Sequence, residues 1–296
     1  PAIVSIFLGD ELTAILRSII DGTAYVDITK KKLEIGVDTL PELPQDTTDR
    51  NRTSPLAFTG NKFEFRMLGS SQSIASPNVV LNTIMADELK QFADRLEKAE
   101  SFHQALQELL RDTFRDHQRI IFDGNGYDDD WVQEAKRRGL SNLRDTVDCM
   151  PAYIDEKNVA LFSRFGILTP EEMHARYEIH LENYCKVTAI EAATLRDMTL
   201  RGILPAVTRC SRKGVLRKRQ AEMTTSCRVE NYLVQQLDTL SGDLLDACQA
   251  MSRALEAAPA ADAGIDAARY YRDEVASRLE EMRSIIDRME PLVGAD

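Results

Sequence analysis

The residues best suited to chemistry are Lys62-Phe63-Glu64-Phe65-Arg66, where charged and aromatic side chains alternate. In an extended strand, a period of two places Lys62, Glu64 and Arg66 on one face and both phenylalanines on the other. A carboxylate between two cations suits a site for metal and phosphate, because the carboxylate is a hard oxygen ligand and the cations hold phosphoryl or carboxylate oxygens. An ordinary half-buried strand with a solvated polar face explains the pentapeptide equally well.

The residues around this strand favour the first interpretation. Arg52 lies upstream in an Asn-Arg-Thr-Ser turn, and Gly60 and Asn61 lead into the strand. A Gly-Ser-Ser-Gln-Ser stretch follows, before a helix that we expect to begin at Pro77. Upstream, the proline-stiffened segment 40–44 is either the mouth of a pocket or a plain connector.

These residues resemble a known family. The segment NRTSPLAFTGNKFEFRMLGSSQSIASPN closely resembles the late ATP- and glutamate-binding motif of glutamine synthetases, in the form found in their type III, long-chain branch. The match continues from PAIVSIFLGDEL through FSRFGILTPEEMHARYE to the helical tail, and so covers essentially the whole chain. The resemblance implies a cytoplasmic ligase of nitrogen metabolism that makes glutamine from glutamate, ammonia and ATP with Mg²⁺ or Mn²⁺. It also implies self-association as a dodecamer of two stacked hexameric rings.

The resemblance assigns roles residue by residue. Glu64 matches the metal-ligand glutamate, and Arg66 matches the arginine that contacts the glutamate substrate. Lys62 matches a cation on the side of the ATP phosphates, and Arg52 matches the arginine that meets the transferred phosphate. Arg52 and Arg66 would therefore be the catalytic residues.

Two positions depart from the family pattern. The shorter-chain enzymes carry an arginine where this chain has Ala57, so one phosphate contact is absent or supplied elsewhere. The flap glutamate cannot be placed, because Glu42 lies in the right neighbourhood at the wrong spacing.

The family's other metal ligands and its glycine-rich ATP segment have no counterpart here. Because the chain does not begin with Met and type III enzymes are much longer, we expect a C-terminal portion that is inactive alone.

Composition limits the classes of partner. An apolar fraction of 43% with 29% charged residues fits a globular protein, and the formal charge of −11 opposes binding to nucleic acid. No apolar run approaches the roughly 20 residues that span a bilayer. The basic run from Arg209 to Arg219 lacks interleaved aromatics, so a solvated helix face or a contact with an acidic neighbouring subunit is favoured over RNA or anionic lipid. Five cysteines without a C-x-x-C pair indicate reduced, cytoplasmic thiols.

We expect a predominantly helical α+β fold. Residues 1–124 would form the C-terminal part of the catalytic domain, with short antiparallel strands and helices to Ile20, over 77–98 and over 101–121. The acidic segment 123–130 resembles a calcium loop, but Asp128 stands where that loop needs glycine. A turn whose aspartates cap a helix near Trp131 is the better interpretation.

Residues 125–296 would form an antiparallel helical tail domain. Gly166 should close a helix over 155–165, and Thr169-Pro170-Glu171-Glu172 combines an N-cap, a first-turn proline and a capping-box glutamate. That helix should break near Gly202 and Pro205 before a second helical region that runs to about residue 257, either unbroken or interrupted near Thr224. Beyond an alanine-rich linker, a seam of core residues is expected at Tyr271, Val275, Leu279, Met282, Ile286 and Met289.

The long amphipathic helices also allow a different function. In this alternative the chain is a non-catalytic helical oligomerisation or interaction module, and the strand is only an ancestral remnant. The joint presence of Arg52, Lys62, Glu64 and Arg66 argues against it, because a scaffold has no use for that combination.

Overall fold

The computed structural model divides the chain into two compact units. The first unit comprises Pro1–Asp145 and Ala160–Ile167, and the second comprises Thr146–Val159 and Leu168–Asp296. Both are rich in helix, and the predominantly helical α+β class is confirmed. The structure describes residues 3–25, 32–33, 43–44, 53–67, 69–70, 72–221 and 228–293.

The first unit contains a small mixed sheet in the order β1-β4-β5. β4 (Leu56–Phe58) and β5 (Phe63–Phe65) are antiparallel neighbours, as expected, whereas β1 (Ile6–Phe7) pairs with β4 in parallel. The parallel pair was not predicted, because it joins segments far apart in sequence, and parallel pairing needs such a long connection. β2 (Lys32–Leu33) and β3 (Leu43–Pro44) form a separate antiparallel pair.

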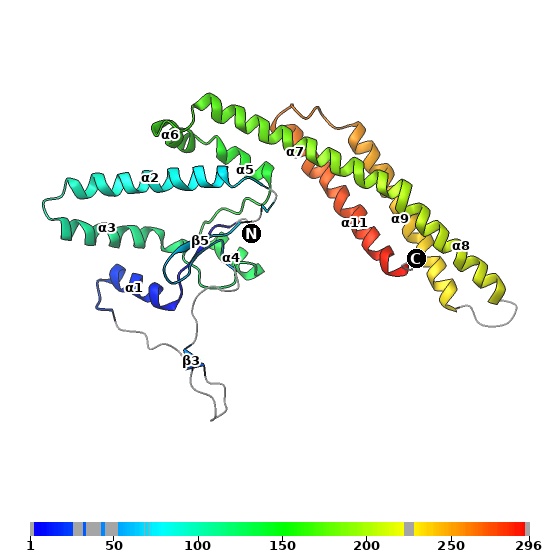
Figure 1. The fold of residues 1–296 in the computed structure, drawn as a ribbon, viewed down its shortest axis with the longest axis horizontal. Coiled ribbons are helices and arrows are strands. Elements are labelled where there is room, and N and C mark those ends of the chain that lie inside the picture. Colours follow the sequence, from blue (N-terminus) through cyan, green and yellow to red (C-terminus); the bar gives the residue numbers. More distant parts are fainter. Residues whose placement is uncertain are drawn as a thin grey trace. The chain divides into compact units, whose positions relative to one another are not determined.

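Several α-helices of the described residues accompany this sheet. α2 (Ala75–Glu97) and α3 (Phe102–His117) pack side by side, and α1 (Asp10–Asp21) packs against α3 (Figure 1). A 3₁₀ turn, η1 (Gln118–Ile120), extends α3 and accounts for the predicted helix end near residue 121. α4 (Asp129–Arg137) follows, and its Trp131 and Ala135 pack with Ile3 in a small core.

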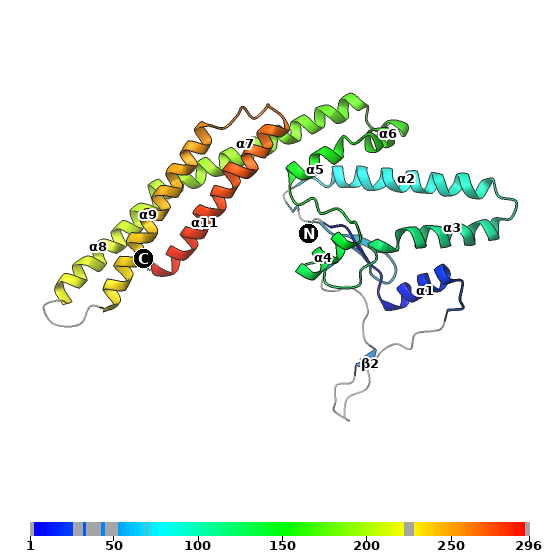
Figure 2. The ribbon, with the colours of Figure 1, turned by 180° about the vertical axis from the view of Figure 1, so that it is seen from behind.

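The second unit is an antiparallel helical bundle, as the seam of apolar residues predicted. α7 (Pro170–Met198) continues through η2 (Thr199–Ile203) into α8 (Leu204–Ala221), and α9 (Arg228–Glu256) packs back along both (Figure 2). The remaining helical segments are α5 (Thr146–Tyr153), α6 (Glu156–Arg164), which is shared between the units, α10 (Ile265–Tyr270), η3 (Tyr271–Ala276), α11 (Ser277–Met289) and η4 (Glu290–Leu292).

The core of the bundle forms where these helices face one another. The predicted seam is confirmed: Tyr271, Val275, Met282 and Met289 are buried, with Leu279 and Ile286 packed partly buried beside them. They meet residues of α7 and α9 that include Leu181, Leu244 and Met251. Burial of such apolar side chains contributes roughly 1.5–3 kcal/mol each, so this interface is the main source of stability in the unit.

The start of α7 is confirmed in atomic detail. The backbone N–H of Glu172 donates to Thr169 Oγ1 at 3.2 Å, and the N–H of Thr169 donates to Glu172 Oε2 at 2.8 Å, with Pro170 in the first turn. Gly166, at φ 63°, adopts the left-handed conformation expected after α6.

The predicted break near Gly202 and Pro205 is wrong. The helix does not stop; it widens into the π-helical turn η2 and continues as α8. Proline lacks a backbone N–H and clashes with the preceding turn, and a locally widened turn relieves both problems without ending the helix.

The described part of the predicted basic run lies at the surface, and most of the described cysteines do not. Arg209, Arg212 and Lys213 of the basic run are exposed on α8. Cys185, Cys210 and Cys248 are free thiols, and Cys185 and Cys248 are buried. Within the described ranges, no helix combines the length and apolarity needed to cross a membrane.

Candidate functional site

The candidate site is built on the hairpin of β4 and β5. Its turn is closed by the N–H of Thr59, which donates to the carbonyl of Lys62 at 2.9 Å, and Gly60 takes the positive φ of 95° that the turn requires. The N–H of Arg66 donates to the carbonyl of Pro55 at 2.7 Å and extends the pairing beyond β5. The hairpin therefore fixes the backbone of all three charged residues.

The charged residues share one face, as their alternation predicted. Lys62 Nζ lies 3.2 Å from Glu64 Oε1, and Arg66 contacts Glu64 Oε2 through Nη2 at 3.0 Å and through Nε at 3.2 Å. The hydrogen bonds from Arg66 and then from Lys62 lower the pKa of Glu64 below its usual value. Glu64 is therefore an ionised carboxylate held between two cations.

The other face of β5 is unusual. Phe63 is 54% exposed, Phe65 is 38% exposed and Met67 is 55% exposed. Phe63 contacts Phe58 of β4, with ring centroids 5.2 Å apart, but the rings leave much of their surface uncovered. An ordinary half-buried strand covers its aromatic side and solvates its charges, whereas here the Arg66 side chain is only 18% exposed. The arrangement thus argues against that simpler interpretation.

Arg52 lies outside the described residues, as does Glu42, so neither can be placed against Glu64. The next residue, Thr53, is held firmly. Its carbonyl accepts the N–H of Gly126 at 2.9 Å, and a Cβ at Gly126 would lie 2.4 Å from the same oxygen. Only glycine permits this close approach.

In the acidic segment 123–130, the Asp123 carboxylate acts as a structural clamp, because it joins this segment to residues 8–13 by hydrogen bonds. Asp123 Oδ1 accepts the N–H groups of Leu8 and Gly9, both at 2.8 Å, and Oδ2 accepts the Thr13 hydroxyl at 2.7 Å. This carboxylate fixes the start of α1 beside β1. The roles of Asp123 and Gly126 were missed from sequence, because their partners are distant along the chain.

The predicted cap of α4 is wrong in its detail. Asp128 occupies the N-cap position but makes no capping hydrogen bond; its Oδ1 accepts instead from Asn125 Nδ2 at 2.7 Å. Asn125 Oδ1 accepts the N–H of Tyr127 at 3.0 Å, which closes the expected turn.

Ala57, the position that departs from the family pattern, lies in the central strand directly opposite Glu64. It is completely buried. Residues directly opposite in a sheet project from the same face, so a small side chain here adjoins Glu64.

The metal-binding capacity of the site is partial. Within the described ranges, no three His, Cys, Asp or Glu side chains come close enough to hold a metal ion. Glu64 is an oxygen donor of the kind that Mg²⁺ and Mn²⁺ prefer, but it is a single carboxylate. A metal ion held by Glu64 would need further ligands beyond this carboxylate.

Comparison with known proteins identifies the family. Residues 105–223 match the glutamine synthetase C-terminal domain. The chain is 44% identical over 209 residues to a type-3 glutamine synthetase of Dictyostelium discoideum, an alignment that covers 70% of this chain and 28% of the relative. It is 34% identical over 310 aligned positions to a glutamine synthetase of Butyrivibrio fibrisolvens, covering 99% of this chain and 42% of the relative.

A glutamine synthetase of Bacteroides fragilis (strain YCH46) is similar at 32% identity, over 98% of this chain and 42% of the relative. The chain thus spans less than half the length of these relatives. The resemblance first indicated by the strand motif extends along the chain to its helical bundle, and the chain belongs to the glutamine synthetase family.

Proposed function

We propose that this chain is the C-terminal portion of a cytoplasmic enzyme that ligates ammonia to glutamate at the expense of ATP. The observation that carries the proposal is the ionised Glu64 held between Lys62 and Arg66 on one rigid strand. The names of the relatives support the same activity. The substrates would be glutamate, ammonia and ATP, with Mg²⁺ or Mn²⁺ as the metal.

The chemistry of such a ligase explains why these residue types are needed. The γ-carboxylate of glutamate attacks the terminal phosphate of ATP, ADP leaves, and ammonia then displaces phosphate from γ-glutamyl phosphate to give glutamine. Several anionic oxygens converge in the first step, and their repulsion has to be offset by fixed cations. A divalent metal bound with the help of Glu64 would supply further neutralisation.

Lys62, Glu64 and Arg66 would each neutralise or bind a different charged group in this reaction. Lys62 is 64% exposed and free to turn toward the ATP phosphates, as Arg52 would do from the neighbouring turn. Arg66 is far less exposed, and its planar guanidinium suits the bidentate binding of a carboxylate such as that of glutamate. Because both cations now contact Glu64, binding of metal and substrate would exchange these ion pairs for contacts with ligands.

Activity of an Arg66 variant tests the assignment. In the full-length protein, we expect Arg66→Ala to lower kcat/KM for glutamate at least ~100-fold, since a charge-assisted bidentate contact is worth about 3 kcal/mol or more. Arg66→Lys should recover only part of the loss, because an ammonium cannot form the planar pair. Arg115→Ala removes an exposed arginine of α3 and is the matched control. Unchanged glutamine formation by Arg66→Ala would contradict the assignment.

We further propose that the 296-residue chain alone does not make glutamine, because the described residues place no second carboxylate beside Glu64, where a metal site needs several. ATP-dependent glutamine formation by the purified chain would refute this. Assembly into a dodecamer is proposed for the full-length protein on the family resemblance alone.

One observation favours the second candidate, a helical interaction module. Besides its buried residues, α7 carries exposed apolar residues: Ile179 at 60%, Val187 at 43%, Ile190 at 66% and Met198 at 57%. A stripe of this kind suits contact with another helix or subunit. The two functions are compatible in one protein, and the Arg66 experiment decides whether catalysis is present.

A further inference from the structure

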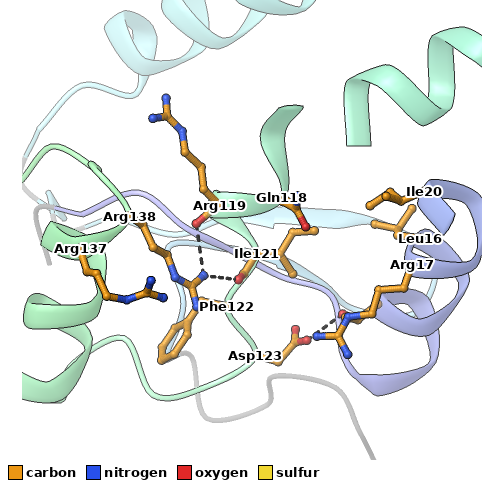
Figure 3. A pocket seen from close by; sticks show the side chains of 11 residues that line it. Leu16, Arg17, Ile20, Gln118, Arg119, Ile121, Phe122, Asp123, Arg137 and Arg138 are labelled. Atoms are coloured by element: carbon orange, nitrogen blue, oxygen red, sulfur yellow. Dashed lines mark hydrogen bonds between the residues drawn. The ribbon is translucent and has the colours of Figure 1, made fainter. Parts of the chain in front are cut away.

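A hollow in the first unit, away from the β4–β5 hairpin, is lined by four arginines. It encloses about 500 Å³ between α1, η1 and the end of α4 (Figure 3). A volume of roughly 300–1,000 Å³ is the usual range for sites that bind small organic molecules. The side chains that line it include Leu16, Arg17, Arg119, Phe122, Arg137 and Arg138.

Each wall follows from local structure. On α1, Thr13, Leu16, Arg17 and Ile20 recur at helical spacing and therefore share the face that borders the hollow. Opposite, η1 leads into Ile121, which bridges to Ile6 of β1. Figure 3 shows Arg17 beside Asp123 on one side, and Arg119, Arg137 and Arg138 on the other.

Two of the arginines already have partners. Arg138 lies over the Trp131 ring at 5.3 Å and donates through Nη1 to the carbonyls of Ile121 at 2.8 Å and Arg119 at 3.2 Å. Arg137 and Arg138 both pair with Glu134, with N···O distances of 2.7 and 2.5 Å. These contacts hold Arg138 as part of the wall.

The lining acid is also engaged. Asp123 accepts two backbone N–H groups and the Thr13 hydroxyl, so its charge is already satisfied by the clamp described above. Arg17 and Arg119 are different: both are exposed, and neither forms an ion pair with any residue in the described part of the chain. In that part of the chain, no acidic partner competes with an anionic ligand for these two guanidinium groups.

The charge of the hollow opposes that of the chain. The protein has a formal charge of −11, yet four arginines line this one concave surface. Cations gathered in a concave surface attract anions more strongly than scattered charges do, because the low-dielectric walls focus their field. Leu16, Ile20 and Phe122 add an apolar wall against which a carbon skeleton can pack.

We propose that this hollow binds a small organic anion with at least two negative charges, of the phosphate-ester or polycarboxylate class. Arg17 and Arg119 hold its charged groups, and the apolar wall contacts its carbon atoms. The site lies at the opposite edge of the sheet from β5, since Ile121 adjoins β1 in the order β1-β4-β5. At ~4.8 Å per strand, this places it roughly 14 Å from the Lys62–Arg66 strand. The proposal does not depend on the ligase activity.

Calorimetric titration of the full-length protein tests the site. The probes are citrate and pyrophosphate, which separate carboxylate from phosphate preference, with uncharged glucose as the negative control. We expect saturable binding of at least one anion, with an affinity that weakens as salt rises from about 50 to about 300 mM, because screening of charges strengthens over that range. Arg17→Gln and Arg119→Gln should each weaken binding roughly tenfold, the loss expected for one charge-assisted hydrogen bond.

Two control variants keep the result specific. Lys157→Gln removes an exposed cation of α6 that does not line the hollow and should leave binding unchanged. Arg66→Ala should also leave this binding intact, so that failure here and failure of the ligase assignment are distinguishable. The proposal is overturned if no probe binds saturably, or if binding is lost in Arg66→Ala while Arg17→Gln and Arg119→Gln retain it.

Discussion

At the scale of single residues, Glu134 illustrates how local cations set a titration. Hydrogen bonds from Arg137 and then from Arg138 lower the pKa of Glu134 from 4.5 to about 2. Because the folded pKa lies below the unfolded value, the stabilisation that Glu134 contributes is complete above pH 4.5 and is lost as the pH falls toward 2.

Removal of Arg137 should therefore reveal how far this arginine shifts the pKa of Glu134. We expect Arg137→Gln to raise the pKa of Glu134 toward its usual value, as measured by NMR titration of the side-chain carboxyl. The same variant should lose stability less steeply with acid between about pH 4.5 and 2, the interval over which the pair titrates. Arg115→Gln, on α3, is the control and should leave the titration of Glu134 unaltered. An unchanged Glu134 pKa in Arg137→Gln would show that this pair does not form in solution.

The close approach of Gly126 to the backbone of Thr53 gives a second prediction for a single residue. A Cβ there would lie 2.4 Å from the carbonyl oxygen of Thr53, which is backbone and cannot rotate away. We expect Gly126→Ala to destabilise the fold by about 1–3 kcal/mol, as overpacking does, in denaturant unfolding. Since Thr53 adjoins Arg52, the variant should also lower the proposed ligase activity of the full-length protein.

Gly242→Ala is the matched control for this change. Gly242 lies exposed in α9 with no atom within 4 Å of an added Cβ, so alanine there should stabilise the helix by roughly 0.5–1 kcal/mol. Equal effects of the two substitutions would refute the close approach of Gly126 to Thr53.

Residue-scale prediction from sequence succeeded where the determinants are local. The alternation through Lys62, Glu64 and Arg66 predicted their shared face, because strand geometry alone decides it. It did not predict that Phe63 and Phe65 are exposed, since their burial depends on what packs against the strand. The links from Asp123 to Leu8 and from Gly126 to Thr53 were also not predictable, because no pattern of spacing connects such distant residues.

At the scale of elements, the capping box of α7 is the clearest case of local control. Thr169→Ala removes the acceptor of the Glu172 N–H, and we expect a loss of about 1 kcal/mol in the free energy of unfolding. Thr208→Ala is the control, because its exposed hydroxyl donates to the carbonyl of Leu204 within a continuous helix and caps no helix end. If the two substitutions cost the same in thermal denaturation, the cap contributes nothing particular to α7.

The turn η2 differs from the helix end that the sequence predicted. Gly202 and Pro205 are strong helix-breaking signals, and they predicted an end to the helix. Packing decided otherwise: Thr199 is completely buried within η2, and Val207 of α8 is also buried in the bundle core. Tertiary burial on both sides of the proline keeps the helix continuous, and the backbone absorbs the missing hydrogen bond by widening.

At the scale of the whole molecule, the position of the domain boundary is open to a direct test. The sequence placed it after residue 124, and this boundary stays a prediction. In the structure, α4 and the residues up to 145 belong to the first compact unit, where Trp131 is 1% exposed and stacks on Phe122 with centroids 3.9 Å apart. A fragment that begins at residue 125 would keep this tryptophan but lose Phe122 and Ile3, its partners in that core.

Two fragments, 125–296 and 146–296, therefore decide between the boundaries. Because the bundle core lies within the second unit, we expect both fragments to give the same cooperative helical melt by circular dichroism. The chain has one tryptophan, so fluorescence reports on Trp131 alone. In the 296-residue chain its emission should be blue-shifted and resist iodide quenching, whereas in 125–296 it should be red-shifted and readily quenched. A protected Trp131 in 125–296, with a melt more stable than that of 146–296, would place α4 in the tail domain after all.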